Sequence, residues 1–166
     1  AGKFQSAGDV AASNIARWDG QAWAALGSGV GVCCTDFVSA LAADAGGALY
    51  AGGSFFQAGG TGAFSVAQWD GTAWSALGPG MQSRTVWALA LDDASGELYA
   101  GGDFSFAGGV TVNHIARWDG SAWSALGSGV SHPTWPRVFA IEAIPGGGAY
   151  VGGQFTQVSG VAANYV

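Results

Sequence analysis

Apolar residues along the chain fall into short runs that are separated by polar, glycine-rich segments. One such run spans 86–91, a turn follows at 92–96, and a second run spans 98–104. Runs of this length between turn residues are typical of β-strands. No stretch keeps the 3.6-residue periodicity of an amphipathic helix over more than two turns. The pattern therefore predicts an all-β protein.

Three phrases recur in register about every 50 residues. The longest contains Trp-Asp-Gly, a second Trp and Leu-Gly, and its copies occupy 14–29, 65–80 and 114–129. A phrase with Tyr, a Gly-Gly pair and Phe occupies 49–55, 98–104 and 149–155. A third phrase, Val-x-Ala followed by Leu or Ile, begins at Val38, Val86 and Val138. Positions that recur together at one period indicate an internal repeat.

Each repeat divides into four short strands, the last two of which flank an Asp-Gly hairpin turn. Four antiparallel strands repeated about every 50 residues are the arrangement of a β-propeller blade. We expect one propeller segment over residues 1–166 with about three and a half blades. Their approximate bounds are 1–30 (partial), 37–80, 85–129 and 137–166 (partial).

The repeated tryptophans and glycines have distinct predicted roles. The two tryptophans of each copy are bulky enough to fill the space between blades. These pairs are Trp18/Trp23, Trp69/Trp74 and Trp118/Trp123. The Gly-Gly pairs mark places where a strand kinks or another backbone approaches closely. They stand at 52/53, 101/102 and 152/153.

The repeat resembles known families of propeller repeats. A glycine doublet after an apolar-Tyr pair, followed by Phe and a Trp strand, is similar to kelch-type repeats. The fuller form, YAGGxF followed by IARWDGxxWSALGxG, looks closer to Rax2-like repeats of large extracellular and cell-surface proteins. This resemblance covers essentially the whole chain and implies the propeller fold and an extracellular or cell-surface location. It implies little about function.

Composition and charge narrow the classes of partner. The 166 residues carry a formal net charge of −6, and only 10% are charged. The five Lys and Arg residues are scattered, whereas nucleic-acid binding requires a basic patch. No apolar run approaches the roughly 20 residues of a membrane span. We therefore expect no nucleic-acid partner and no membrane span.

Residues that serve catalysis elsewhere do not form catalytic patterns here. Three repeated aspartates are predicted to close Asp-Gly turns through their own backbone, and these are Asp19, Asp70 and Asp119. His114 and His132 lack metal-ligand spacing. His114 is interpreted as an ordinary start-of-strand residue, because Asn14 and Ser65 hold the same place in the other copies. We expect no enzyme activity, no metal site and no cofactor.

Differences between repeats concentrate in the links from the last strand of one blade to the first strand of the next, at 33–36, 82–84 and 132–137. Loops on a rigid scaffold often hold ligand sites. Trp135 lies between two prolines and close to Arg137, so it is either an aromatic binding platform or a plug in the seam between blades. The candidate ligand-binding residues are Trp135, Arg137, His132, Gln82, Arg84, Asp36 and Trp87.

Cys33 and Cys34 are adjacent in the first link. Adjacent Cα atoms lie about 3.8 Å apart, below the usual separation of about 4.4–6.8 Å for a disulfide. A bond between them is a strained vicinal disulfide. The alternatives are two free thiols or pairing with another part of the protein. A secreted setting favours the vicinal disulfide slightly.

Two functions are compatible with these features. The first is a non-enzymatic propeller module with a structural or protein-interaction role. The second is a lectin in which Trp135, Trp87 and Phe139 stack on sugar rings while Asp36 or Gln82 binds hydroxyl groups. Because propellers close with about 4–8 blades, we expect that either further blades of a longer chain or a second copy completes the ring. Two copies would give about seven blades.

Overall fold

The computed structural model describes residues 1–82 and 84–163. These residues contain strands, turns and loops but no helix, which confirms the predicted all-β class. The strands form several small antiparallel sheets. They group into four consecutive repeat units, which we number along the chain.

The strands of each unit follow the repeats of the sequence. The first unit contains β1 (Ser6–Ala7), β2 (Val10–Ala11), β3 (Ala16–Trp18) and β4 (Trp23–Ala25). The second contains β5 (Phe37–Ala43), β6 (Leu49–Ser54), β7 (Gln57–Ala58), β8 (Thr61–Gly62), β9 (Val66–Trp69) and β10 (Trp74–Ala76). The third contains β11 (Val86–Asp92), β12 (Glu97–Gly102), β13 (Phe106–Ala107), β14 (Val110–Thr111), β15 (Ile115–Trp118) and β16 (Trp123–Ala125). The fourth contains β18 (Arg137–Ala143), β19 (Ala149–Gln154), β20 (Gln157–Val158) and β21 (Val161–Ala162), and β17 (Val130–Ser131) lies in the link before it.

The two central units have complete four-stranded sheets. Their strand orders are β5-β6-β9-β10 and β11-β12-β15-β16, and all neighbours are antiparallel. Along the chain, the second and third strands of each sheet are connected through a hairpin of two short strands, β7-β8 or β13-β14. In the terminal units only β3-β4 and β18-β19 pair in the corresponding sheets. The described part of each terminal unit therefore contains two of the four strands of this sheet.

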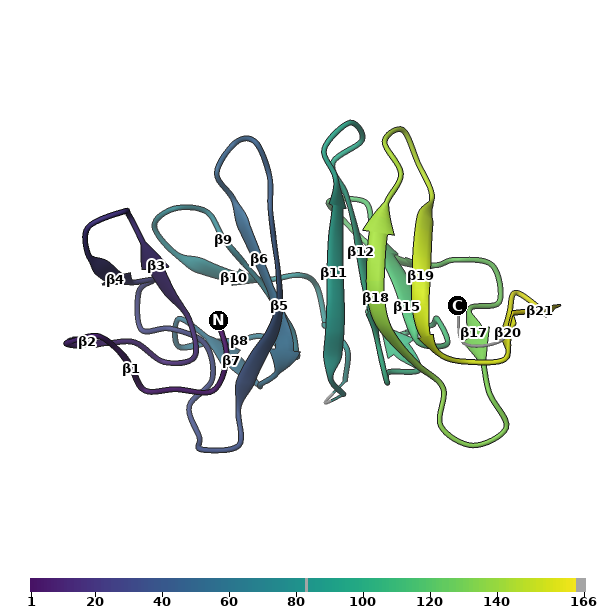
Figure 1. Cartoon of the computed structure of the whole chain (residues 1–166), viewed down its shortest axis with the longest axis horizontal. Coiled ribbons are helices and arrows are strands. Elements are labelled where there is room, and N and C mark those ends of the chain that lie inside the picture. Colours follow the sequence, from purple (N-terminus) through teal and green to yellow (C-terminus); the bar gives the residue numbers. More distant parts are fainter. Residues whose placement is uncertain (83, 164–166) are drawn as a thin grey trace.

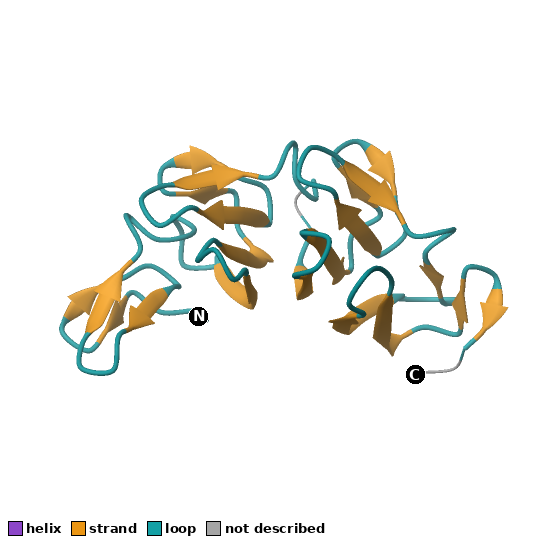
Figure 2. Ribbon diagram, turned by 90° about the horizontal axis from the view of Figure 1, so that it is seen from above, coloured by secondary structure: helices purple, strands orange, loops and turns teal. Residues whose placement is uncertain are grey.

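The four units stand side by side along an open arc (Figure 2). The first strands of the second, third and fourth units, β5, β11 and β18, are neighbours (Figure 1). The Ser39 hydroxyl on β5 donates a hydrogen bond to the Val86 carbonyl on β11 at 2.5 Å. The first and fourth units lie at opposite ends of the arc (Figure 2).

The hydrophobic core lies between the units rather than inside each sheet. Ile15, Leu26 and Val30 of the first unit pack with Phe55 and Trp74 of the second. Further clusters join the second unit to the third and the third to the fourth. A single sheet therefore has no core of its own and depends on its neighbours.

Two tryptophans confirm the predicted packing between repeats. The Trp74 indole N–H donates to the Leu26 carbonyl of the preceding unit at 2.9 Å, and that of Trp123 donates to the Leu77 carbonyl at 2.9 Å. In the first copy the prediction was wrong for the described chain. Trp18 and Trp23 are 52% and 43% exposed, because no preceding unit covers them.

The Gly-Gly pairs confirm the predicted close approach. A Cβ atom built on Gly52 would lie 2.6 Å from Val86 Cγ1 of the next unit. A Cβ atom built on Gly53 would overlap the carbonyl oxygen of Phe37 on the neighbouring strand. Gly52 thus leaves room for the next unit. Gly53 leaves room for the first strand of its own sheet, beside the bulge at 38–40.

Candidate functional site

The link before β18 closes over a cavity at the seam between the third and fourth units. One lining residue comes from the link before β11, three come from the third unit, and four come from the link before β18 and the start of β18. They are Arg84, Asp103, Ser105 and His114, and Thr134, Trp135, Pro136 and Arg137. The cavity has a volume of about 240 Å³. The structure thus brings together three residues that the sequence predicted as ligand-binding, namely Arg84, Trp135 and Arg137.

Backbone hydrogen bonds fix the third-unit wall of this cavity. The Thr85 N–H donates to Asp103 Oδ1 at 2.9 Å, and the Asp103 N–H donates to the Thr85 carbonyl at 3.2 Å. This reciprocal pair holds the end of β12 against the residue before β11. Arg84, the residue before Thr85, is exposed and lines the same wall.

His114 forms another part of this wall in an unusual backbone conformation. Its φ is +73°, and Asn14 and Ser65 at the equivalent positions have φ of +61° and +65°. The His114 N–H donates to the Phe104 carbonyl at 2.8 Å. The repeat thus requires a left-handed residue here, and histidine is the only one of the three with a titratable side chain.

Burial keeps the His114 side chain neutral. Its Nδ1 atom is buried without a hydrogen-bond partner among the described residues. Desolvation lowers the pKa of His114 below its ordinary value, the nearby Asp103 carboxylate opposes this shift, and Arg84 adds to it. Near neutral pH the imidazole therefore adds no positive charge to the cavity.

The fourth-unit wall carries the exposed aromatic residue of the site. Trp135 is 68% exposed. Pro136 follows it, and a residue before proline is restricted to extended conformations. Arg137 is the first residue of β18 and is half-buried. Trp135 is thus an exposed surface beside the cavity rather than a buried plug in the seam.

Other predicted ligand-binding residues lie outside this cavity. Gln82 is exposed with a φ of +47°. His132 is half-buried, and its Nδ1 accepts a hydrogen bond from the Thr134 N–H at 3.2 Å. Neither lines the cavity with Trp135.

Trp87 belongs to a row of aromatic rings across the first strands of three units. Its ring centroid is 5.7 Å from that of Phe37 and 6.3 Å from that of Phe139. Phe139 is 49% exposed. The buried Nε1 atom of Trp87 has no partner among the described residues. This aromatic row is separate from the cavity lining.

Asp36 forms its hydrogen bonds within its own loop. The residue is buried, and its Oδ2 accepts hydrogen bonds from the N–H groups of Val32 at 2.8 Å and Cys33 at 3.1 Å. Burial by itself raises the pKa of Asp36, but these N–H groups together with the Cys33 thiol outweigh it and lower the pKa. Both carboxylate oxygens are therefore hydrogen-bonded within the link.

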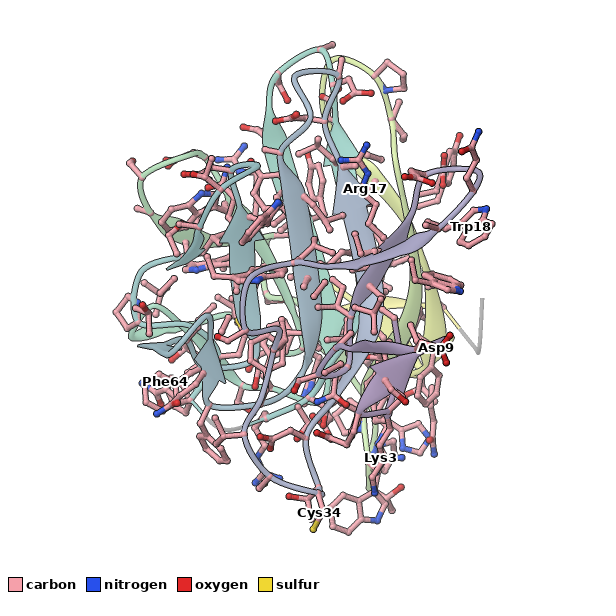
Figure 3. The ribbon with its side chains drawn as sticks, turned by 90° about the vertical axis from the view of Figure 1, so that its left-hand side faces the viewer. Lys3, Asp9, Arg17, Trp18, Cys34 and Phe64 are labelled. Carbon is pink, nitrogen blue, oxygen red and sulfur yellow. The ribbon has the colours of Figure 1, made fainter. Side chains whose placement is uncertain are left out.

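Cys33 and Cys34 are both exposed free thiols in the structure, so the vicinal disulfide is not formed there. The Cys33 Sγ atom donates to Asp36 Oδ1 at 3.2 Å. Figure 3 shows Cys34 at the outer end of its loop. Oxidation of the pair stays a prediction, which intact mass tests through the loss of two hydrogens.

The three repeated aspartates close their turns as predicted. Asp119 Oδ1 accepts from the N–H groups of Ser121 and Ala122, both at 2.8 Å, and Asp19 and Asp70 have the same pattern. The Ala122 N–H foremost, followed by the hydroxyl and N–H of Ser121, lowers the pKa of Asp119 to about 2. These carboxylates are turn-forming groups.

Besides Thr134 and Pro136 of the link, sequence reasoning missed three residues of the third unit that line the cavity: Asp103, Ser105 and His114. The signal was their departure from the other repeats. Ser54, Phe56 and Ser65 occupy the equivalent positions of the second unit. Charged and titratable groups are thus concentrated at one seam, which the shared repeat pattern does not explain.

No group of three or more His, Cys, Asp or Glu side chains placed to hold a metal ion occurs in residues 1–82 and 84–163. The same residues contain no helix that is long and apolar enough to cross a membrane. Searches of protein-family models and of curated proteins each found no match to the sequence. The resemblance to kelch-type and Rax2-like repeats stays a prediction.

Proposed function

We propose that the chain is a non-enzymatic β-propeller module with a structural or protein-interaction role in an extracellular or cell-surface protein. Two features support the propeller: the four-stranded antiparallel sheets that recur with the repeat, and the apolar cores between neighbouring units. The proposed location rests on the resemblance of the repeats.

The observation that supports this role most strongly is the complementarity of the two ends of the arc. In the central units the third strand pairs with the second, as β9 does with β6. Among residues 1–82 and 84–163, β3 has no such partner, and neither does β19 on its corresponding edge. An unpaired strand edge is a template for pairing with another chain. The open edge of β3 at one end of the arc can therefore pair with the open edge of β19 at the other end of a second copy.

The exposed tryptophans of the first unit also match the other end of the arc. Trp18 projects from the edge of the first unit (Figure 3). The Trp18 and Trp23 rings have a centroid separation of 5.3 Å, close to the 5.5 Å of the covered pair Trp69/Trp74. Leu126 is the third-unit equivalent of Leu26, which accepts the Trp74 indole N–H. The indole N–H of Trp23, the equivalent of Trp74, could thus donate to the Leu126 carbonyl of a second copy.

Pairing of β3 with β19 of another copy would follow the register of β6 and β9. In that register Leu49 faces Trp69 and Ala51 faces Ala67. The corresponding pairs are Ala149 with Trp18 and Val151 with Ala16. Two half-sheets would then merge into one, so that two copies would form six four-stranded sheets rather than about seven. Further blades of a longer chain would satisfy the same edges.

Light scattering on the 166-residue chain tests this proposal. We expect a dimer, or aggregation that indicates missing blades of a longer chain. Trp23→Arg should weaken association because it places a charge in the interface. Val32→Arg is the matched control, since Val32 is 72% exposed in the first link. A stable wild-type monomer with cooperative unfolding would contradict the proposal.

Carbohydrate binding is the second candidate function. The exposed ring of Trp135 beside a polar cavity favours it, because aromatic faces can stack on sugar rings. A glycan array with wild-type protein and Trp135→Ala tests it. We expect sugar binding that the substitution removes, and wild-type protein that binds no glycan would contradict this candidate.

A further inference from the structure

The cavity between the third and fourth units is lined by two arginines, Arg84 and Arg137, that form no ion pair with a carboxylate of the described residues. Among residues 1–82 and 84–163 the ion pair formed is Arg117 with Glu97, at 3.1 Å. Arg84 and Arg137, by contrast, line the cavity without an ion pair to any described carboxylate. Arginine side chains that face a cavity suit an anionic ligand, because the guanidinium group can donate two parallel hydrogen bonds to a carboxylate.

We propose that this cavity binds the carboxylate of an acidic sugar, a uronic acid, with Arg84 and Arg137 holding the carboxylate and Trp135 covering a face of the sugar ring. The inference rests on the carbohydrate-binding candidate above and specifies its ligand class. It assigns no role to the aromatic row around Trp87.

The charge of the lining favours an anion that carries a single negative charge. Arg84 and Arg137 contribute two positive charges, Asp103 contributes one negative charge, and the half-buried His114 is neutral near pH 7. The cavity therefore has a net charge of about +1 from these groups. A carboxylate neutralises it, whereas a phosphate monoester carries about −1.5 to −2 at pH 7 and would be repelled by Asp103.

The size and shape of the cavity favour one sugar residue. Its volume of about 240 Å³ is below the roughly 300–1,000 Å³ of sites for drug-sized ligands. Trp135 is 68% exposed at the rim, and its large face is amphipathic with few rotatable bonds. A ring with a carboxylate on one side and an apolar C–H face on the other matches this arrangement.

The other seams provide a comparison within the same chain. At the seam between the second and third units, Ser54, Phe56 and Ser65 replace the acidic residue, the serine and the histidine. The Phe56 and Phe64 rings there lie 6.0 Å apart in an edge-to-face arrangement. Asp103, Ser105 and His114 are therefore particular to the seam between the third and fourth units and are not a structural requirement of every seam.

Titration of the 166-residue chain with methyl glucuronide and methyl glucoside, followed by calorimetry and tryptophan fluorescence, tests the inference. We expect the glucuronide to bind at least about tenfold more tightly, since hydrogen bonds between charged groups are the stronger ones. Arg84→Gln and Arg137→Gln should each remove most of this preference. Arg117→Gln is the matched control, because Arg117 is paired with Glu97 away from the cavity.

Removing the negative charge of Asp103 tests the inference in the opposite direction, because glucuronide binding should become tighter. Asp103→Asn keeps an oxygen that can accept from the Thr85 N–H but removes the negative charge. We expect it to tighten glucuronide binding several-fold and to leave glucoside binding unchanged. Thermal unfolding of each variant verifies that the fold is retained.

The outcomes separate this inference from the candidate on which it rests. Equal affinity for the two sugars, unchanged by Arg84→Gln and Arg137→Gln, would overturn the carboxylate site and leave carbohydrate binding in place. Binding of inorganic phosphate in preference to the glucuronide would overturn the ligand class. If neither sugar binds and the glycan array is also negative, both ideas fail.

Discussion

The three tryptophan pairs have the same local geometry in different surroundings. The ring centroids are 5.3, 5.5 and 5.3 Å apart, and the interplanar angles are 54°, 52° and 48°. Directly opposed positions on the third and fourth strands produce this geometry, as Trp118 and Trp123 show. Burial differs, because it depends on whether a preceding unit is present.

Trp123→Ala should destabilise the protein by about 3–5 kcal/mol, the usual cost of removing a buried tryptophan. It also leaves the buried Leu77 carbonyl without the indole donor. Trp23→Ala is the matched comparison and should cost much less, because Trp23 is 43% exposed. Urea unfolding of the two variants measures the difference, and equal losses would contradict the assignment of Trp123 to the seam.

Asp119 should make stability sensitive to acid. Its pKa in the folded protein is about 2, against an ordinary value of 3.8. The unfolded chain therefore takes up this proton first as the pH falls. The stabilisation is fully present above the ordinary pKa and is lost as the pH falls toward 2.

The Asp119→Asn variant isolates this effect, because asparagine retains an oxygen acceptor for the turn but does not titrate. We expect the urea midpoint of the wild type to fall more steeply between pH 4 and pH 2 than that of the variant. Parallel pH profiles would show that Asp119 is not responsible.

At the scale of strands, glycine sets how closely the units approach one another. A Cβ atom built on Gly101 would lie 2.8 Å from Ile141 Cδ1 and would overlap Val138 of the next unit. Gly102 excludes a Cβ for another reason, since one there would overlap the Thr85 carbonyl oxygen within its own sheet. Consecutive glycines thus serve two different contacts.

Gly101→Ala should lower stability by about 1–3 kcal/mol, the typical cost of overpacking a core. Gly62 in β8 is the control, because a Cβ there meets no atom within 4 Å. Gly62→Ala should change stability by less than about 0.5 kcal/mol. Thermal unfolding compares them, and a neutral Gly101→Ala would mean that the seam relaxes to accept the methyl group.

For the whole molecule, the stability of each unit depends on its position in the arc. The second and third units pack against a neighbour on both sides, whereas the first and fourth have one described neighbour. Repeat arrays of this kind gain stability from nearest-neighbour interfaces. The terminal half-sheets therefore have fewer stabilising contacts than the central sheets.

Hydrogen exchange should reveal this gradient. In dilute, unassociated protein we expect the amides of β3 and β19 to exchange faster than those of β6 and β12. Association should protect β3 and β19, because their open edges become paired. Uniform protection along the chain under dilute conditions, unchanged by concentration, would contradict both the gradient and the proposed pairing.

The sequence by itself determined the all-β class, the positions of the strands and the roles of the repeated residues. The Asp-Gly turns, the Gly-Gly contacts and the buried positions of Trp74 and Trp123 all follow from a pattern that recurs in register. Such features could be predicted because they depend on neighbours along the chain or on the equivalent neighbour in the adjacent repeat.

Only the tertiary structure decided which residues of different repeats meet. Trp18 and Trp23 have the same sequence context as their counterparts but are exposed, because burial requires a unit on the other side. Arg84 and His114 join Trp135 and Arg137 in one cavity, although the sequence places them on separate links and strands. Their meeting depends on how the units are stacked and angled, and that is set by the long-range packing of the seams.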